Sequence, residues 1–522
     1  MGMTLRIVWF KRDLRVVDHG PLLDAAESAD AVLPLYVIEP TLWAQPDMAP
    51  RHWQFIHAAL QELDAALSRL GQPLVIRQGD AATIFRELAA AYRISAVHAH
   101  QETGNAWTYQ RDLTVSAVLR EAGIPLFETR QHGVVRRLGQ RDGWSRQWEG
   151  LMAEAIRPAP DALRPAVGIR GIRLPDLPGE LTDAPRQRHI QPGGRERGLR
   201  VLQGFLEHRG IGYSGGISSP VTAWQSSSRL SPHLAWGTLS LREVVHASRA
   251  RRQSLRDEAA SPERRRWLRS LRNFEERLHW HCHFMQKLES EPRIEFENMH
   301  RACDGLRENE FRQDRFDAWC RGETGLPLVD ACMRAVNAGG WLNFRMRALV
   351  VSFAAYHLWL HWRQPALYLA RQFTDYEPGI HYCQFQMQSG TTGINTLRIY
   401  NPVKQSRDQD PDGVFIRRWI PELGQVPTRW LHEPWTMPEA VQRDSGCRLG
   451  EDYPLQVVEH EQAAREARQR FTPIRRSAAA NAEADAIRHK HGSRRRPAPR
   501  RTRPRPQPPQ LSLFGDDGHE ES

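Results

Sequence analysis

A hydroxyl-rich turn near the middle of the chain has the composition of a phosphate site. The segment SSSRLSPHLAWGTLS, residues 226–240, is followed at once by a helix that Ser231-Pro232 would open. Side-chain hydroxyls, backbone amides and a helix N-terminus all favour a bound anion. The residues concerned are Ser227, Ser228, Arg229, Leu230 and Ser231. An ordinary serine-capped helix has the same local pattern, so the neighbouring motifs must decide between the two.

The composition is that of an ordinary globular protein with a basic charge. Its 522 residues include 72 Lys and Arg against 61 Asp and Glu, a formal net charge of +11. Because neutralising phosphates releases condensed counterions, this balance favours a polyanionic partner such as nucleic acid. The cysteines form no C-x-x-C pair, which argues against a zinc ribbon or the usual iron–sulfur spacing. No apolar run reaches the ~18 residues of a membrane helix, and we expect a cytoplasmic protein.

The first part of the chain alternates between strand-like and helical stretches. Apolar segments such as LRIVWF, AVLPLYVIE and ISAVHAH are separated by amphipathic runs such as DAATIFRELAAAYR. This alternation predicts an α/β domain with a mostly parallel, Rossmann-like sheet over residues 1–132. The first turn, FKRDLRVVDHG, lacks the glycines of a dinucleotide fingerprint, so a Rossmann-type cofactor is poorly supported there.

The composition changes three times further along. Residues 133–199 are predicted to be an interdomain linker, because Pro, Gly and Arg dominate its second half with little periodicity. Residues 200–472 carry helical patterns such as RMRALVVSFAAYHLWLHW, which predict a large all-α domain. Residues 473–522 combine low hydrophobicity, clustered positive charge and frequent Pro. We therefore expect a disordered basic tail there.

Three long motifs follow one another in the helical region. They are GLPLVDACMRAVNAGGWLNFRMRALVVSF (325–353), HWRQPALYLARQFTDYEPGIHYCQFQMQSGTTG (361–393) and LRIYNPVKQSRDQDPDGVFIRRWIPEL (397–423). In this order and spacing they resemble the FAD-binding domain of the DNA photolyase and cryptochrome family. The N-terminal IVWFKRDLRVVDHGPL resembles the opening strand and loop of the same family. The resemblance runs to about residue 470 and suggests a divergent bacterial member.

The resemblance implies a flavin site. Tyr213, in GIGYSGG, matches the family tyrosine near the flavin phosphates, and residues 227–231 match its phosphate cradle. Arg347 and Asp375 match an ion pair beside the isoalloxazine ring, with Glu377 as a neighbouring acid. FAD is therefore the expected cofactor.

The resemblance also implies a substrate cavity and a reaction. Trp280, in LHWHCHF, and Trp341, in GGWLNF, match aromatics that line the cavity for a flipped base, which must leave the duplex to be reached. In this family, reduced FAD excited by blue light donates an electron to a pyrimidine dimer in DNA, which splits and returns it. The function implied is that of a deoxyribodipyrimidine photo-lyase. A basic rim is expected to hold DNA phosphates unless it is only a solvated charged surface, and its members are Arg398, Lys404, Arg407, Arg417 and Arg418.

The stretch HYCQFQMQ departs from the family pattern. His381 stands where the family often has Asn facing the flavin N5, and it either donates a proton there or is merely hydrogen-bonded. Phe385 replaces the flavin-proximal Trp of the family's electron chain, and Met387 replaces a Trp that faces the lesion. Trp362 remains as the second member of that chain, and the detours we consider run through Tyr382, Trp359 or Tyr356. Phe344 and Ala348 also differ from dimer-repairing members, which leaves the lesion type open.

Two further ligand questions arise from the residues. His279 and His283 are spaced i, i+4 on a helix, but without an H-E-x-x-H carboxylate we expect no metal site there. Glu102 falls where folate-binding members carry a Glu. A second antenna chromophore, of folate or flavin type, is therefore an open expectation.

The tail ends in an apolar cluster. QLSLF, with Gln510, Leu511, Leu513 and Phe514, resembles the short peptide by which many bacterial polymerases and repair proteins dock to the replication sliding clamp. A tethered peptide gains effective concentration, so the tail predicts recruitment to DNA, with a chance match as the alternative.

Two functions share these features. The first is light-driven repair of pyrimidine dimers by a monomeric flavoprotein. The second is a cryptochrome-like blue-light photoreceptor that uses the same flavin pocket for signalling, which the interrupted electron chain favours. A flavoprotein that binds DNA without repairing it is a third possibility.

Overall fold

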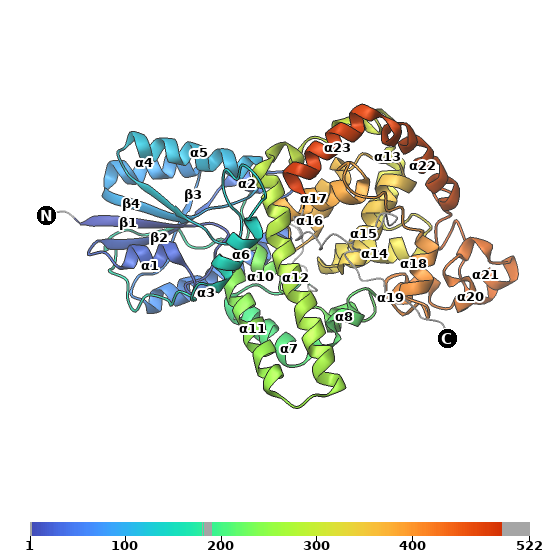
Figure 1. The fold of residues 1–522 in the computed structure, drawn as a ribbon, viewed down its shortest axis with the longest axis horizontal. Coiled ribbons are helices and arrows are strands. Elements are labelled where there is room, and N and C mark those ends of the chain that lie inside the picture. The colour runs from blue at the N-terminus through green and yellow to red at the C-terminus, as the bar shows by residue number, and fades with distance from the viewer. Residues whose placement is uncertain (1–2, 180, 182–189, 493–522) are drawn as a thin grey trace, which may run out of the picture.

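The N-terminal region is a parallel sheet covered on both faces. The computed structural model describes residues 3–179, 181 and 190–492, and its five-stranded sheet has the order β3-β2-β1-β4-β5 with every pair parallel. The strands are β1 (Thr4–Phe10), β2 (Ala31–Ile38), β3 (Val75–Gln78), β4 (Arg93–His100) and β5 (Leu126–Thr129). The covering helices are α1 (Gly20–Ala26), α2 (Pro40–Trp43), α3 (Pro50–Arg69), α4 (Ala81–Ala91) and α5 (Ala106–Glu121). With α4 and α5 on one face and α1 and α3 on the other (Figure 1), β2 is buried at every position, as expected of a parallel sheet. The predicted α/β domain is confirmed.

The stretch expected to be a linker is partly structured. It contains the helix α6 (Trp144–Ala153), whose Trp144, Trp148 and Met152 recur every four residues and are buried. These side chains pack in a core shared with Phe205. Further along, the backbone N–H of Val32 donates to the carbonyl of Arg164 (2.9 Å), so this segment runs alongside the sheet.

The rest of the described chain is helical, as predicted. Its α-helices are α7 (Arg195–Glu207), α8 (Tyr213–Gly216), α9 (Ala223–Ser226), α10 (Ser231–Ala235), α11 (Leu241–Asp257), α12 (Pro262–Ser290), α13 (Gln313–Arg321), α14 (Pro327–Gly339), α15 (Phe344–Ser352), α16 (Arg363–Gln372), α17 (Pro378–Ser389), α18 (Pro402–Gln409), α19 (Val414–Trp419), α20 (Thr428–Leu431), α21 (Glu439–Ser445), α22 (His460–Arg476) and α23 (Ala478–His491). The longest, α12, has 29 residues and begins where the Ser261 side chain accepts from the N–H of Arg264, with Pro262 in the first turn. It runs past both halves of the molecule (Figure 1) and packs against α17.

Buried arginines join the two regions. Arg15 donates to the carbonyl of Gly237 (2.9 Å), and Arg51 donates to those of Val336 (3.0 Å) and Gln372 (2.6 Å). Gly237 has φ +66°, and a Cβ there would meet the Arg12 carbonyl at 2.2 Å. The loop after β1 is thereby held against the helical region.

The sequence prediction places the start of the disordered tail, residue 473, too early in the chain. Residues 478–491 form α23, because the Ala-rich piece has high helix propensity and Ser477 caps it by accepting from the N–H of Ala480. Ala480, Ala484 and Ile487 are buried, and Glu291 lies 2.5 Å from His491 and 2.8 Å from Lys490. The basic run beyond residue 492, with Gln510–Phe514, lies outside the described residues.

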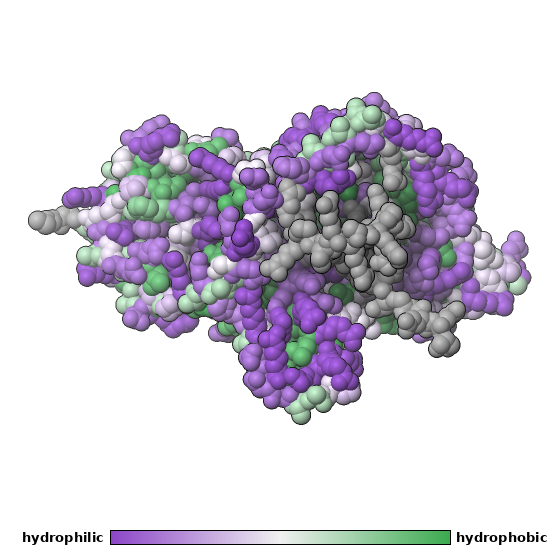
Figure 2. All heavy atoms as spheres, in the orientation of Figure 1, coloured by the Kyte–Doolittle hydropathy of each residue, from purple (hydrophilic) through white to green (hydrophobic). Residues whose placement is uncertain are grey.

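The visible surface is mainly polar. Figure 2 shows hydrophilic side chains over most of this face, with small, separate hydrophobic areas. Among the described residues, no helix is both long and apolar enough to cross a membrane.

Candidate active site

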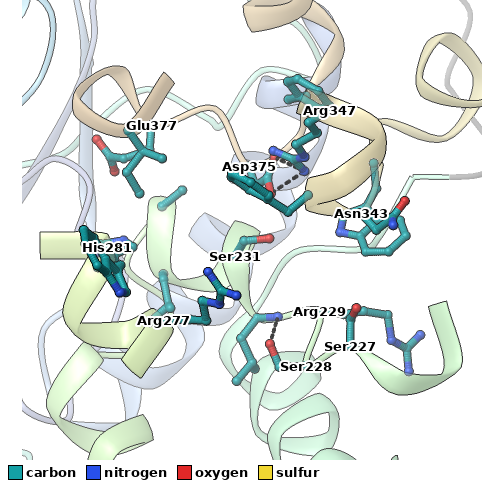
Figure 3. A pocket seen from close by; sticks show the side chains of 18 of the residues that line it. Ser227, Ser228, Arg229, Ser231, Arg277, His281, Asn343, Arg347, Asp375 and Glu377 are labelled. Atoms are coloured by element: carbon teal, nitrogen blue, oxygen red, sulfur yellow. Dashed lines mark hydrogen bonds and ion pairs between the residues drawn. The ribbon is translucent and has the colours of Figure 1, made fainter. Parts of the chain in front are cut away.

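A cavity in the helical region collects most of the predicted site residues. It encloses about 1400 Å³ of empty space, part of it open to solvent, between the turn before α10, the middle of α12, and the starts of α15 and α17. The predicted residues that line it are Tyr213, Ser227, Ser228, Arg229, Leu230, Ser231, Trp280, Trp341, Arg347, Asp375, Glu377 and His381. Side chains more than 150 residues apart in the sequence therefore meet at one place (Figure 3).

One side of the cavity is rich in hydrogen-bond donors. Arg229 adopts φ +58°, which is rare for a residue with a side chain and turns the chain sharply between Ser228 and Ser231. The Arg229 Nε is buried without a hydrogen-bond partner among the described residues. Arg277, from α12, lies beside the Tyr213 phenol and faces the same space. The helix α10 has only five residues, too few for its N-terminus to serve as an anion site. The groups available to an anion are therefore the serines and arginines.

The opposite side carries an ion pair, as predicted. The Arg347 Nη2 donates to the Asp375 carboxylate at 2.8 and 3.1 Å (Figure 3), and its Nε donates to the carbonyl of Leu342 at 2.9 Å. The guanidinium also stacks on Phe373, 3.9 Å from the ring centroid. These contacts fix the Asp375 carboxylate at the cavity wall as a rigid acceptor.

Glu377 is a buried acid on the same wall. Burial raises its pKa to about 7, although the Arg12 guanidinium at 3.6 Å acts in the opposite direction. At neutral pH its carboxyl is therefore partly protonated and can donate as well as accept a hydrogen bond.

We expect Glu377→Gln to change the pH dependence of stability. A carboxyl with pKa about 7 when folded and 4.5 when unfolded destabilises the fold as pH rises between those values. The variant should therefore gain stability relative to the parent protein over that range, by up to about 3 kcal/mol at pH 8. Urea unfolding across pH measures this. Glu439→Gln, whose side chain is 92% exposed, is the control, and parallel curves for Glu377→Gln and the parent protein would contradict the expectation.

Trp280 was predicted, but the sequence analysis missed Arg277, His281 and Phe284, which line the cavity from the same helix. Arg277, Trp280, His281 and Phe284 line the cavity from α12 at spacings of three, four and seven residues. That periodicity is the signal that could have found the others once Trp280 was chosen. Asn343 and Gln384 also line the cavity, and the Gln384 Oε1 is buried without a partner among the described residues.

His381 is hydrogen-bonded to the protein backbone at the cavity wall. Its Nε2 lies 2.8 Å from the carbonyl of Ala366, so that nitrogen carries the hydrogen and donates it. Burial lowers its pKa to about 4. The imidazole is neutral at pH 7, which agrees with the hydrogen-bonded alternative.

Three residues singled out at the family's tryptophan positions, Phe385, Met387 and Trp362, lie outside the cavity lining. Phe385 packs on His381 with ring centroids 4.7 Å apart, while Met387 and Trp362 are buried in the main core. The Trp362 Nε1 donates to the Asn298 Oδ1 at 2.8 Å.

The expected basic rim is only partly available to DNA. Arg417 donates to the carbonyls of Leu423 (3.1 Å) and Gly424 (2.8 Å), so its guanidinium is held by the turn that follows α19. Arg407 pairs with Glu433, and Lys404 pairs with Asp408 at 3.1 Å on an exposed helix face. Arg418 is exposed and Arg398 half-buried.

The two histidines of the pair on α12 have different hydrogen-bond partners. The His279 Nε2 lies 3.3 Å from the Ser145 Oγ, whereas the His283 Nδ1 accepts from Arg141 at 2.8 Å. A different group that could hold an ion by position was missed: His19 and His100 both hydrogen-bond the buried Asp13 carboxylate, at 2.9 and 2.7 Å.

The expected folate residue is engaged within the α/β domain. The Glu102 carboxylate accepts from Arg111 at 2.6 Å and lies 3.9 Å from the Lys11 ammonium. Arg111 also pairs with Glu39 at 2.9 Å. Glu102 is thus part of a buried charge network.

Known proteins match this chain over nearly its whole length. Family models match at residues 6–140 (DNA photolyase) and 274–473 (FAD-binding domain of DNA photolyase). A deoxyribodipyrimidine photo-lyase of Streptomyces griseus is 30% identical over 91% of this chain and 99% of that protein. The chain belongs to the DNA photolyase and cryptochrome family. It contains the FAD-binding domain of that family, so FAD is its cofactor.

Both branches of the family occur among the relatives. A cryptochrome DASH of Natronomonas pharaonis is 30% identical over 88% of this chain and 98% of that protein. The crystal structure of a class III photolyase from Agrobacterium tumefaciens has a TM-score of 0.78 at 28% identity, covering 91% of this chain and 99% of that one. A cryptochrome from Synechocystis gives 0.79 at 25% identity, covering 90% and 99%.

Proposed function

We propose that this chain is a light-driven DNA lyase that splits pyrimidine dimers. The observation that carries the proposal is a single cavity. It has hydrogen-bond donors at residues 227–231 on one side, the Arg347–Asp375 ion pair on the opposite side, and aromatic side chains between them. The cradle suits the phosphates of FAD, and the Asp375 carboxylate with the buried Gln384 Oε1 suits its hydrogen-bonding ring edge. The residues present therefore fit the cofactor of the family.

The chain's own residues bind, orient and keep the site dry. Ser227, Ser228 and Arg229 would hold the phosphates, while Arg347 fixes Asp375 in place. Trp280 and Trp341 would stack on an extruded dimer and exclude water from it. When bound and reduced, FAD supplies the light-driven electron that opens the dimer. The similarity to the deoxyribodipyrimidine photo-lyase of Streptomyces griseus supports this reaction.

Repair of a defined thymine-dimer oligonucleotide tests the proposal. The flavin is reduced chemically, so the assay does not depend on the interrupted electron chain. Loss of the dimer under blue light, and not in darkness, is expected. If FAD is bound but neither this dimer nor a (6-4) lesion is lost, the second candidate, a blue-light photoreceptor, replaces the first. The phenylalanine at position 385 and the cryptochrome relatives favour that candidate.

We further propose that the C-terminal peptide recruits the protein to a DNA-bound clamp. Leu511, Leu513 and Phe514 can fill an apolar groove, and Gln510 can hydrogen-bond beside it. The preceding basic stretch adds attraction to DNA, and linkage raises the effective concentration.

Replacing Leu513 and Phe514 together by Ala is expected to abolish clamp binding and leave flavin content unchanged. The reason is that the two side chains supply most of the apolar area of the peptide. Surface plasmon resonance on a purified bacterial sliding clamp measures it, with Ser512→Ala as the matched control. Equal affinity of the double variant and the parent chain would remove the recruitment idea.

A further inference from the structure

A buried tyrosine stands at the flavin cavity, close to where the family's electron chain is interrupted. Phe385 occupies the position of the oxidisable tryptophan, and phenylalanine is much harder to oxidise. Tyr376 lines the cavity, is 2% exposed, and lies 5.2 Å from the His381 ring between centroids. It is therefore a redox-capable side chain that already faces the cofactor's space.

Tyr376 is linked to Trp362 through a second tyrosine. The Tyr376 and Tyr382 hydroxyl oxygens are 3.2 Å apart, and the two ring centroids are 6.4 Å apart. The Tyr382 ring is in turn 6.4 Å from the Trp362 ring. Trp362 adjoins His361, whose side chain is 20% exposed, with ring centroids 5.5 Å apart. The three redox-capable rings are thus consecutive neighbours leading from the cavity toward the surface.

A carboxylate from the α/β domain serves both phenols. The Asp47 Oδ2 accepts from the Tyr376 hydroxyl at 2.6 Å, from the Asn105 amide at 2.9 Å and from the Tyr382 hydroxyl at 3.4 Å. Asp47 is 2% exposed, and its Oδ1 is buried without a partner among the described residues. Burial and the nearby Asp47 raise the pKa of both tyrosines well above its usual value, so both are protonated at rest. A phenol loses its proton when it loses an electron, and this carboxylate can receive it.

We infer that Tyr376, Tyr382 and Trp362 form the electron route to the flavin, with Asp47 as the proton acceptor. The inference rests on the proposed function insofar as it needs bound FAD. Tyr376 would give one electron to the light-excited, oxidised flavin, and its phenolic proton moves to the Asp47 carboxylate. Tyr382 then gives one electron to the Tyr376 radical, while Asp47 returns the proton to Tyr376 and accepts the phenolic proton of Tyr382. Trp362 gives one electron to the Tyr382 radical, which recovers its proton from Asp47, and the Trp362 radical cation keeps its indole N–H. An external thiolate restores Trp362 by giving one electron, and two of the resulting thiyl radicals join as a disulfide. A second cycle delivers the second electron, and solvent supplies the proton that the flavin takes up.

The first test is photoreduction of the full chain carrying oxidised FAD. Under blue light with a thiol reductant, Tyr376→Phe, Tyr382→Phe and Trp362→Phe should each lose the oxidised flavin absorbance at least about tenfold more slowly than the parent protein. Tyr368→Phe is the matched control, since its hydroxyl also makes a hydrogen bond inside the protein, to the Cys320 carbonyl at 2.9 Å, and its rate should stay within about twofold of the parent rate. Parent-like rates for Tyr382→Phe and Trp362→Phe would overturn the route.

The second test is spectroscopic and does not depend on variants. Flash illumination of protein grown with ring-deuterated tyrosine should give an electron paramagnetic resonance signal narrowed by the label, and absence of a tyrosyl signal overturns the inference even if a variant misfolds.

A third test uses a variant of the proton acceptor. Asp47→Asn should slow photoreduction and remove the effect of heavy water on its rate. An unchanged isotope effect in that variant excludes Asp47 as the acceptor.

The failure of this route and the failure of the proposed function are distinguishable. Tyr382→Phe and Trp362→Phe, whose residues are not part of the cavity lining, are also assayed for dimer repair after chemical reduction, which bypasses the route. Slow photoreduction with normal repair of the chemically reduced variants is the expected pair of results. A parent chain that photoreduces through the tyrosines but repairs no lesion would keep the route and reject the lyase.

Discussion

Asp375→Ala is expected to strip FAD from the chain and to lower the free energy of unfolding by about 2–3 kcal/mol. Removing one partner of a buried ion pair leaves the other charge without compensation, which typically costs about 3–5 kcal/mol. Here the Arg347 side chain keeps 26% of its surface exposed, so water offsets part of that loss. The flavin would in addition lose an acceptor that is 9% exposed and held rigidly at 2.8 Å. Flavin absorbance after gel filtration and urea unfolding measure the two effects.

An exposed pair provides the control for that prediction. Arg312 and Asp314 lie 2.7 Å apart with side chains 59% and 63% exposed, so Asp314→Ala should leave the free energy of unfolding nearly unchanged. Asp375→Asn keeps the shape and one acceptor oxygen, and should retain part of the flavin. Full flavin content in Asp375→Ala would mean that Asp375 is not a cofactor contact.

Sequence patterns predicted those parts of the fold and the site that depend on residues close together in the chain. The alternation of strand-like and helical segments predicted the parallel sheet, because the apolar pattern of each segment indicates which of its residues are buried. The resemblance pointed to residues 227–231, which line the cavity, and to the Arg347–Asp375 ion pair, because each belongs to a motif that matches the family. Arg277, His281 and Phe284 could also have been found, because they share a helix face with Trp280.

Other features depend on contacts that no local pattern reports. Asp47 and Tyr376 are 329 residues apart, and only the packing of the α/β domain on the helical domain brings the carboxylate to the phenol. The pKa of His381 follows from burial and the carbonyl of Ala366, neither of which its sequence neighbours indicate. In α23 the clustered charge obscured a helix signal that was present: alanines, a serine cap and basic residues in the last turn.

Trp280→Ala is expected to weaken binding of dimer-containing DNA by about 10- to 100-fold while flavin content stays unchanged. Stacking of a base on an aromatic side chain is worth about 1–3 kcal/mol, and Trp280 lines the cavity from a rigid helix. Its ring is held by His283 and Phe284, at 4.8 and 5.8 Å between centroids, so the stacking surface is already in place before DNA arrives. Fluorescence anisotropy with damaged and undamaged oligonucleotides of the same sequence measures the loss.

The comparison between the two DNAs separates stacking on the lesion from general attraction. Trp280→Phe keeps an aromatic face and should recover most of the affinity, whereas removing a phosphate contact would weaken damaged and undamaged DNA alike. Trp224→Ala is a second control, because Trp224 touches Trp341 edge-on, with centroids 5.2 Å apart, from outside the cavity lining. An equal loss for damaged and undamaged DNA in Trp280→Ala would place this residue on the DNA-binding surface and not in the lesion pocket.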